Sequence, residues 1–269
     1  MDLVQTSTVA SLLLSLAASM PVGARTHYPE VPWKLEAKWA VEKAGYFQGD
    51  IVVPEGQPLE VNAVTSRKRL WPRGIIPYTV DDLFTYQETI KDIRMWMNMI
   101  EYLTCLQFVE RTTEPDYIHI HPGTGCYSYV GCNGGEQVLS LGRGCLYEGT
   151  VVHELLHAAG LHHAHTRPDR DEHLDILWTN IDPDYIDHFE KQDLPAEELP
   201  VPFDTHSVML YPADAFVRRA GLTTIKAKDG SPLPQLYNKT GLSDIDILTV
   251  GILYNCSRRW RPKLVPHEL

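Results

Sequence analysis

The spacing of apolar residues along the chain predicts several helices and strands. Ile90, Ile93, Met97 and Ile100 recur at helical intervals, which predicts an amphipathic helix with one buried face. Other short apolar segments lie between turn-forming residues and predict strands or a further helix. The predicted helices cover residues 88–103 and 150–159, and the predicted strands cover residues 75–80, 117–121 and 137–141.

The segments on either side of these elements have a different composition. Residues 25–61 are polar and proline-rich with little apolar periodicity, so we predict a pro-segment or linker rather than a packed domain. The regular fold is expected to begin near Leu70. Beyond residue 160, Pro, Asp and turn residues dominate, which predicts an irregular second half with a late helix over residues 243–254.

The amino terminus resembles an export signal. An apolar run over residues 9–18 precedes the small residues Val22, Gly23 and Ala24, so residues 1–24 are predicted to be a signal peptide and the protein to be secreted and extracellular. The segment before the run has Asp2 and no Lys or Arg, which leaves a membrane anchor as the alternative. The run is too short to span a bilayer comfortably, so we expect no stable membrane association.

The composition and net charge of the chain argue against some classes of binding partner. With 269 residues, 43% of them hydrophobic, the chain suits one domain plus processed segments. Its formal charge of -11 argues against a nucleic-acid partner, because phosphate binding requires clustered Lys and Arg. Five cysteines in an exported chain imply disulfides with at least one thiol left over, and Asn238 and Asn255 begin potential glycan acceptor tripeptides.

The candidate chemistry lies in the second predicted helix. His153 and His157 are one helical turn apart, so both imidazoles can reach one metal ion. Glu154 between them is placed to accept a proton from water that the metal has made more acidic, which is the chemistry of amide hydrolysis. A five-residue match of this kind also occurs by chance on a solvated helix.

Gly160 and His163 make the pattern far more specific. Gly160 can adopt the left-handed conformation that ends a helix, which turns the chain so that His163 returns to the metal. Three neutral imidazoles leave coordination positions open for water and substrate, as a catalytic zinc site requires. The sequence therefore predicts one catalytic Zn²⁺ bound by His153, His157 and His163.

With this motif, the chain resembles the astacin family of zinc metalloendopeptidases in the metzincin clan. The resemblance covers most of residues 45–257, including residues 125–131, 166–171 and the Met-turn at residues 207–211. It implies an α+β metzincin-like fold, with an upper part of twisted sheet and helices, a lower irregular part with a C-terminal helix, and zinc in the cleft between them. The corresponding domain is residues 62–259, followed by a short tail at 260–269.

The resemblance also assigns roles that composition does not. It implies that Met209 forms an apolar floor beneath the zinc and that Tyr211 is a switching zinc ligand that stabilises the oxyanion; without the zinc motif, both residues are ordinary core residues. The implied disulfides are Cys105 with Cys256 and Cys126 with Cys145, which leaves Cys132 free or paired with another molecule.

Residues 47–50, Phe-Gln-Gly-Asp, resemble the family's pro-segment motif. By that resemblance, Asp50 binds the zinc in the zymogen and displaces the catalytic water, and Gly49 lets the backbone approach the cleft. An ordinary turn is the alternative. An activating protease is expected to produce a mature terminus near Asn62, with residues 67–69 as a competing cleavage site.

Two positions depart from the family pattern. Ala164 stands where the family usually has the glutamate that anchors the mature amino terminus, and Leu210 stands where it usually has histidine. Neither change removes a zinc ligand or the base. His119 and His121 share one strand face, and we expect that face to be solvated rather than metal-binding.

The sequence thus predicts a secreted zinc endopeptidase that acts on proteins or peptides and is made as a latent zymogen. The alternative from another class is a catalytically silent secreted binding protein that keeps the fold. Glu154 argues against it, because a protein without turnover needs no base. A purely structural zinc site is a further alternative, and it requires a fourth protein ligand.

Overall fold

The computed structural model describes residues 32–56, 69–84, 86–192 and 201–256. The predicted signal peptide, the expected cleavage region around Asn62 and the tail at 260–269 lie outside the described residues. Trp33 to Leu269 form one compact unit, and all that follows concerns that unit. None of the described helices is long and apolar enough to cross a membrane.

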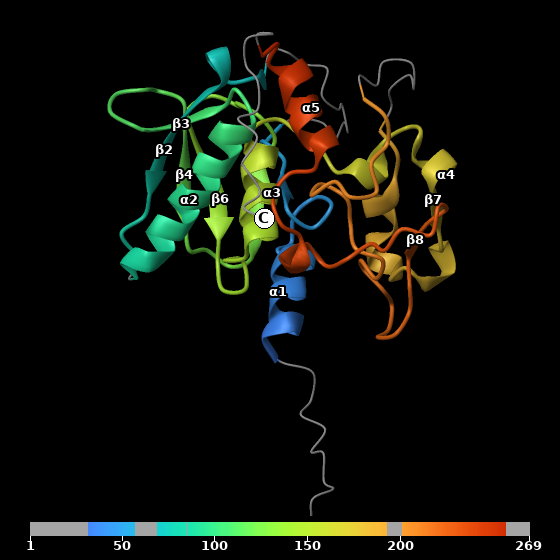
Figure 1. Cartoon of the computed structure of the whole chain (residues 1–269). Helices are drawn as coiled ribbons and strands as arrows, with labels where there is room; N and C mark the ends of the chain where they lie inside the picture. The colour runs from blue at the N-terminus through green and yellow to red at the C-terminus, as the bar shows by residue number, and fades with distance from the viewer. Residues whose placement is uncertain (1–31, 57–68, 85, 193–200, 257–269) are drawn as a thin grey trace, which may run out of the picture. The chain divides into compact units, whose positions relative to one another are not determined.

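The unit is an α+β assembly, as the sequence predicts (Figure 1). The helices are α1 (Pro32–Glu42), α2 (Gln87–Leu103), α3 (Glu148–Ala158), α4 (Arg170–His173) and α5 (Asp244–Leu253). The strands are β1 (Ile51–Val52), β2 (Ile75–Val80), β3 (Gln107–Glu110), β4 (Tyr117–His121), β5 (Cys126–Tyr129), β6 (Glu136–Leu141), β7 (Leu174–Ile176) and β8 (Ile225–Ala227).

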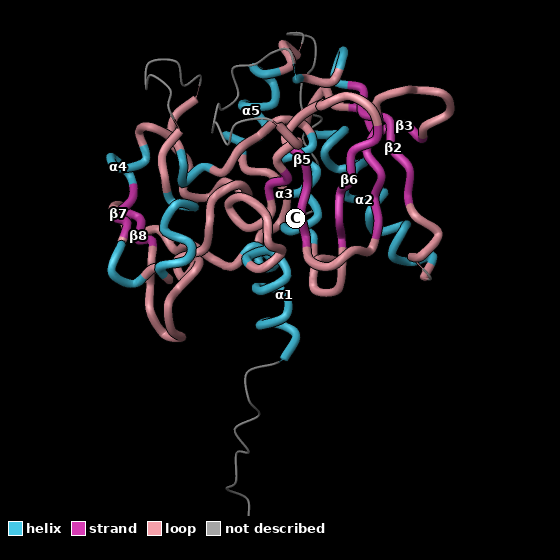
Figure 2. The backbone as a smooth tube through the Cα atoms, turned by 180° about the vertical axis from the view of Figure 1, so that it is seen from behind, coloured by secondary structure: helices cyan, strands magenta, loops and turns pink. Residues whose placement is uncertain are grey.

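A mixed sheet forms the first half, in the order β1-β5-β6-β4-β2-β3. All neighbours are parallel except β5 and β6, which are antiparallel. Helices α2 and α3 lie on one face of this sheet (Figure 1). In the opposite view, the strands lie in front of these helices (Figure 2). The second half is mostly irregular, with β7 and β8 as an antiparallel pair.

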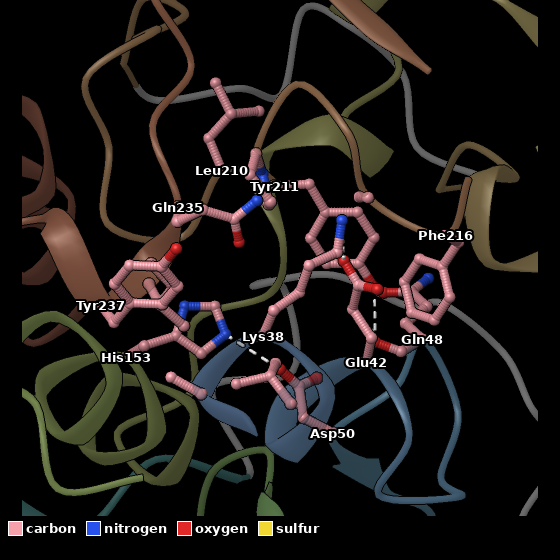
Figure 3. Close-up of a pocket in the computed structure, with 15 residues that line it drawn as sticks. Lys38, Glu42, Gln48, Asp50, His153, Leu210, Tyr211, Phe216, Gln235 and Tyr237 are labelled. Carbon is pink, nitrogen blue, oxygen red and sulfur yellow. Dashed lines mark hydrogen bonds and ion pairs between the residues drawn. The ribbon is translucent and has the colours of Figure 1, made fainter. Parts of the chain in front are cut away.

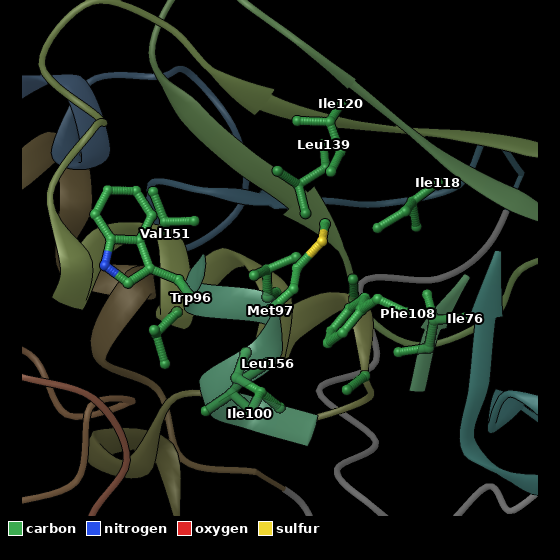
Figure 4. Close-up of a cluster of buried hydrophobic side chains, with 14 of the residues drawn as sticks. Ile76, Trp96, Met97, Ile100, Phe108, Ile118, Ile120, Leu139, Val151 and Leu156 are labelled. Carbon is green, nitrogen blue, oxygen red and sulfur yellow. The ribbon is translucent and has the colours of Figure 1, made fainter. Parts of the chain in front are cut away.

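The main core lies between the sheet and the helices (Figure 4). The apolar face of α2 buries Ile93, Met97 and Ile100 as predicted. Ile90 does not follow this prediction: it is 36% exposed, because the first turn of α2 borders an open groove beside β2 and β3. Trp96 is buried on the same helix face instead.

Residues 33–56 pack on the rest of the unit, so they are not a linker, and the pro-segment stays a prediction. They form helix α1 and a tight turn, and then strand β1 pairs in parallel with β5, Ile51 beside Ser128. Ala37, Ala40 and Ile51 are buried. The segment has too few apolar residues to form a core of its own, so periodicity does not reveal it; it is ordered by packing on the rest of the unit.

Candidate active site

Helix α3 carries two histidines and a glutamate into the interior. Residues 149–158 are all buried, which is typical of a helix that is surrounded by its own domain. His153, Glu154 and His157 are therefore polar groups without access to solvent. Such groups are costly to bury unless they have partners or bind a metal ion.

A turn after α3 brings the third histidine back to the helix. Gly160 has φ +106°, and its N–H donates to the His157 carbonyl at 2.8 Å while Leu161 N–H donates to Leu156 O at 3.0 Å. This left-handed turn is favourable for glycine and ends the helix as predicted. It places His163 Nε2 3.2 Å from His153 Nε2 and 3.2 Å from His157 Nε2.

Backbone carbonyls fix the tautomers of the two helix histidines. His153 Nδ1 lies 2.9 Å from Val208 O, and His157 Nδ1 lies 2.7 Å from Leu161 O. A carbonyl only accepts hydrogen bonds, so each Nδ1 carries the hydrogen and donates it. The Nε2 of each neutral ring is then an unprotonated lone pair that faces the cluster.

The third ring is held in the same way by residues 47–50. His163 Nδ1 lies 2.9 Å from Gln48 Oε1, which is an acceptor, so its Nε2 also faces the cluster without a hydrogen. Burial holds the pKa values of His157 and His163 well below the ordinary range, which keeps these rings neutral. Sequence reasoning missed the role of Gln48, because a lone glutamine gives no signal.

Asp50 completes the cluster. Its Oδ2 lies 3.1 Å from His153 Nε2, and its Oδ1 lies 3.2 Å from His163 Nε2 and 3.7 Å from His157 Nε2. With no hydrogen on these nitrogens, every contact joins two electron-rich atoms, and Asp50 Oδ1 has no hydrogen-bond partner among the described residues.

A divalent cation at the centre of the cluster would be bound by these electron-rich atoms and would offset the repulsion between them. The four residues offer ligand atoms that all lie within 4.8 Å of one another. A tetrahedral zinc site with Zn–N distances of about 2.0 Å separates its nitrogens by about 3.3 Å, which matches the spacing of His163 from the other two rings. Three imidazoles and one carboxylate therefore fit a Zn²⁺ ion.

Glu154 lies beside the cluster but outside it. Its side chain is fully buried, and neither carboxylate oxygen has a hydrogen-bond partner among the described residues. Burial, with a further contribution from the charge of Asp50, raises the pKa of Glu154 well above its usual range. A carboxylate with no structural partner and a raised pKa is suited to accept a proton near neutral pH.

Comparison with known proteins identifies the family. Residues 63–255 match the model of the Astacin peptidase family. The chain belongs to the astacin family. It is 37% identical over 238 residues to zinc metalloproteinase nas-6 of Caenorhabditis elegans, which covers 84% of this chain and 67% of that protein.

Two further relatives belong to different animals. Astacin-like metalloprotease toxin 1 of Loxosceles intermedia is 42% identical over 215 residues, covering 78% of this chain and 80% of the toxin. The solved structure of high choriolytic enzyme 1, a hatching enzyme zinc-protease from Oryzias latipes, is similar with a TM-score of 0.65 and 36% identity, over 71% of this chain and 97% of that one. The chain is therefore a zinc metalloendopeptidase whose substrates are proteins or peptides.

In this member of the astacin family, the Met-turn residues Met209 and Tyr211 are buried. Met209 is buried in the main core and its carbonyl accepts a hydrogen bond from Ala164 N–H at 2.9 Å. Tyr211 stacks on His165, with ring centroids 3.6 Å apart, and its hydroxyl donates to Gln48 O. The Tyr211 ring also lies 4.6 Å from the ring of His163, while its hydroxyl is bound by Gln48, and its role in catalysis remains a prediction.

A buried carboxylate fixes the Met-turn. Asp246 accepts from Ser207 Oγ at 2.6 Å and from Val208 N–H at 2.9 Å, and it also closes the capping box of α5 with Ser243. Lys239, whose pKa burial lowers to about 8, donates to the Ser207 and Leu210 carbonyls at 2.7 and 2.6 Å. Sequence analysis did not single out either charge, because their contacts join residues about 30 to 40 positions apart.

We therefore expect Asp246→Ala to destabilise the fold. Three donors and the buried Lys239 ammonium would lose their acceptor or counter-charge, which costs about 3 to 5 kcal/mol in free energy of unfolding. Asp244→Ala, an exposed change in the same helix turn, is the control and should cost less than about 1 kcal/mol. Urea denaturation measures both, and equal effects would show that the Met-turn does not depend on this carboxylate.

The structure pairs Cys105 with Cys256 and Cys126 with Cys145, the arrangement that the resemblance implies, and Cys132 is free. His119 and His121 share one face of strand β4, as predicted. The rings of His119 and His121 stack with centroids 5.9 Å apart, and His119 pairs with Asp81 at 3.3 Å. They are partly buried rather than solvated, and they are not part of the metal cluster.

Proposed function

We propose that this chain is a secreted astacin-family endopeptidase made as a latent precursor, which another protease activates by removing the residues up to about Asn62. The observation that carries the proposal is Asp50 among the three histidines, at 3.1 to 3.7 Å from their Nε2 atoms. A carboxylate in that position occupies the coordination that water and substrate need for hydrolysis.

Other contacts of the pro-segment support latency. Gly49 has φ +87°, and a Cβ there would lie 3.0 Å from Phe216 Cζ, so glycine allows the backbone to pass close to the cleft wall. Strand β1 extends the sheet beside β5, where Ser128 N–H donates to Asp50 O at 2.9 Å. Lys38 forms an ion pair with Asp214 at 2.7 Å. Together these contacts hold Asp50 in place.

Each site residue then has a distinct task once the pro-segment leaves. His153, His157 and His163 hold the zinc, which when bound supplies a Lewis acid that polarises the peptide carbonyl and makes water more acidic. Glu154 accepts the proton of the attacking water and passes it to the leaving amine. Tyr211, released from Gln48 O, is free to donate its hydroxyl to the oxyanion of the tetrahedral intermediate.

Secretion has support of its own. Two disulfides are typical of chains that fold in an oxidising compartment, and Asn238 of the glycan acceptor tripeptide is exposed. Expression in an animal cell line, with mass spectrometry of the medium, tests this directly. A chain that begins near residue 25 in the medium is expected; a chain kept in the cell with residues 1–24 intact would contradict secretion.

Latency is tested by comparing the intact chain with the same chain after limited proteolysis. We expect hydrolysis of a quenched fluorescent peptide only after cleavage between residues 50 and 70, with zinc content unchanged. Equal hydrolysis by the intact zinc-loaded chain would show that the precursor is not latent.

Glu42 makes the binding of the pro-segment to the rest of the chain dependent on pH. It lies beside Lys38, 3.6 Å from its Nζ, with its side chain 11% exposed, and desolvation raises the pKa of Glu42 from 4.5 to about 7, a difference of about 3 kcal/mol. A raised carboxyl pKa stabilises the docked state below about pH 4.5, and this stabilisation is lost as pH rises through about 7.

The intact precursor should therefore lose about 1 kcal/mol of stability from Glu42 between about pH 6 and pH 8.5. Glu42→Gln should remove that part of the pH dependence, and Glu55→Gln, an exposed change in the same segment, should not. Chemical denaturation at both pH values measures the effect. Identical pH dependence in the parent and Glu42→Gln would contradict it.

A further inference from the structure

The pro-segment places a lysine ammonium in a defined site on the cleft wall. Lys38 Nζ donates to Asp214 O at 2.6 Å and to Asp214 Oδ2 at 2.7 Å. The Lys38 side chain is 12% exposed, although a lysine ammonium is normally hydrated at the surface. Gln235 Nε2 donates to the other oxygen, Asp214 Oδ1, and so fixes the orientation of the carboxylate.

This lysine site opens onto the same cavity as the metal ligands. Lys38, Asp50 and His153 line one cavity together with residues 210–212, 215–216 and 235–237 (Figure 3). Asp214 is not part of this lining and borders the cavity through its contact with Lys38 Nζ. Only part of that lining belongs to the domain; Lys38, Glu42, Gln48 and Asp50 belong to the pro-segment. When the pro-segment leaves, the space that it fills becomes continuous with the zinc site.

Removal of the pro-segment leaves Asp214 without a cation. Among the residues that the structure describes, the ion pairs of Asp214 involve Lys38 alone, and Gln235 is neutral. The remaining groups are one carboxylate, one backbone carbonyl that points the same way, and apolar neighbours such as Pro212 and Leu236. Such a wall can hold the methylene stem of a long basic side chain and pair with its charged end.

We infer that Asp214 is a specificity-determining residue that binds a lysine or arginine side chain of the peptide substrate, at the site that Lys38 occupies in the precursor. The inference rests on the proposed function, because the site opens only when the pro-segment is removed. Lys38 then serves as an internal substitute for the substrate's basic residue, just as Asp50 takes the place of water.

A peptide library tests this on the full chain after activation and separation from its pro-segment. We expect the zinc-loaded parent to prefer Lys or Arg over norleucine at one substrate position by about tenfold in kcat/KM, as a half-exposed charge-assisted contact provides. Asp214→Asn keeps the oxygen that accepts from Gln235 and should reduce that preference to about twofold or less. Asp214→Lys should shift the same position toward Glu and Asp.

The control is Asp184→Asn, an exposed change of equal charge at a residue that forms no ion pair with Lys38 in the described structure, and it should keep the parent's preference. Binding of lysine and norleucine peptides to the activated Glu154→Gln chain, followed by fluorescence anisotropy, gives a readout that needs no turnover. It separates failure of this inference from failure of the proposed function. A parent without basic preference, or an Asp214→Asn chain that retains it in both assays, would show that Asp214 only latches the pro-segment.

Discussion

Glu154→Gln should abolish peptide hydrolysis by the activated chain while zinc stays bound. Glutamine keeps the size of the side chain but cannot accept a proton, and loss of a general base lowers the rate by about 100-fold to 10,000-fold. The side chain is fully buried and makes no hydrogen bond to the described residues, so no structural contact is lost with its charge.

The design of this test separates the base from the metal site. Zinc content by mass spectrometry and kcat/KM on a fluorescent peptide are measured on the same samples. Glu148→Gln, in the first turn of the same helix and outside the metal cluster, is the matched control and should keep nearly full activity. Normal turnover by Glu154→Gln with zinc present would overturn the role of this residue.

Much of this site could be predicted because the residues that define it are close together in the sequence. His153, Glu154 and His157 lie on one helix, and Gly160 and His163 follow within a single turn, so spacing alone defines their geometry. The strands at residues 75–80 and 117–121 and the late helix are confirmed for the same reason. Their apolar residues recur with the period of the element that they form.

The remaining features depend on contacts that are distant in sequence. Gln48 binds His163 from 115 positions away, and Asp246 binds Ser207 from 39 positions away. Strand β5 was not predicted, because its four residues are too short for a periodic pattern. Helix α1 buries Ala37 and Ala40, but its apolar pattern is too weak to predict it.

Asp50→Ala should make the uncleaved precursor active. Asp50 reaches all three histidines through its two oxygens, and methyl replacement removes the carboxylate that competes with water. A charge-assisted contact of about 1.5 to 3 kcal/mol corresponds to an increase of about tenfold to a hundredfold in the open population. Hydrolysis by the intact variant should rise over the parent by a similar factor.

The activity of that variant should remain below that of the activated chain. Lys38 still pairs with Asp214, and β1 still pairs with β5, so residues 33–52, which we propose to be the pro-segment, continue to cover the metal ligands. Glu55→Ala is the matched control, because it removes an exposed carboxylate from the same segment and touches none of the metal ligands. Mass spectrometry must show that each precursor is intact when it is assayed.

The zinc content of the Asp50→Ala precursor determines how its rate of hydrolysis is interpreted. Three histidines with fixed tautomers suffice to hold the ion, so zinc should stay at one equivalent per chain. If the variant keeps its zinc and is as silent as the parent, coverage by α1 and β1 alone causes latency, and Asp50 is not the switch. If hydrolysis instead rises with zinc retained, the aspartate blocks a site that is otherwise fully assembled in the precursor.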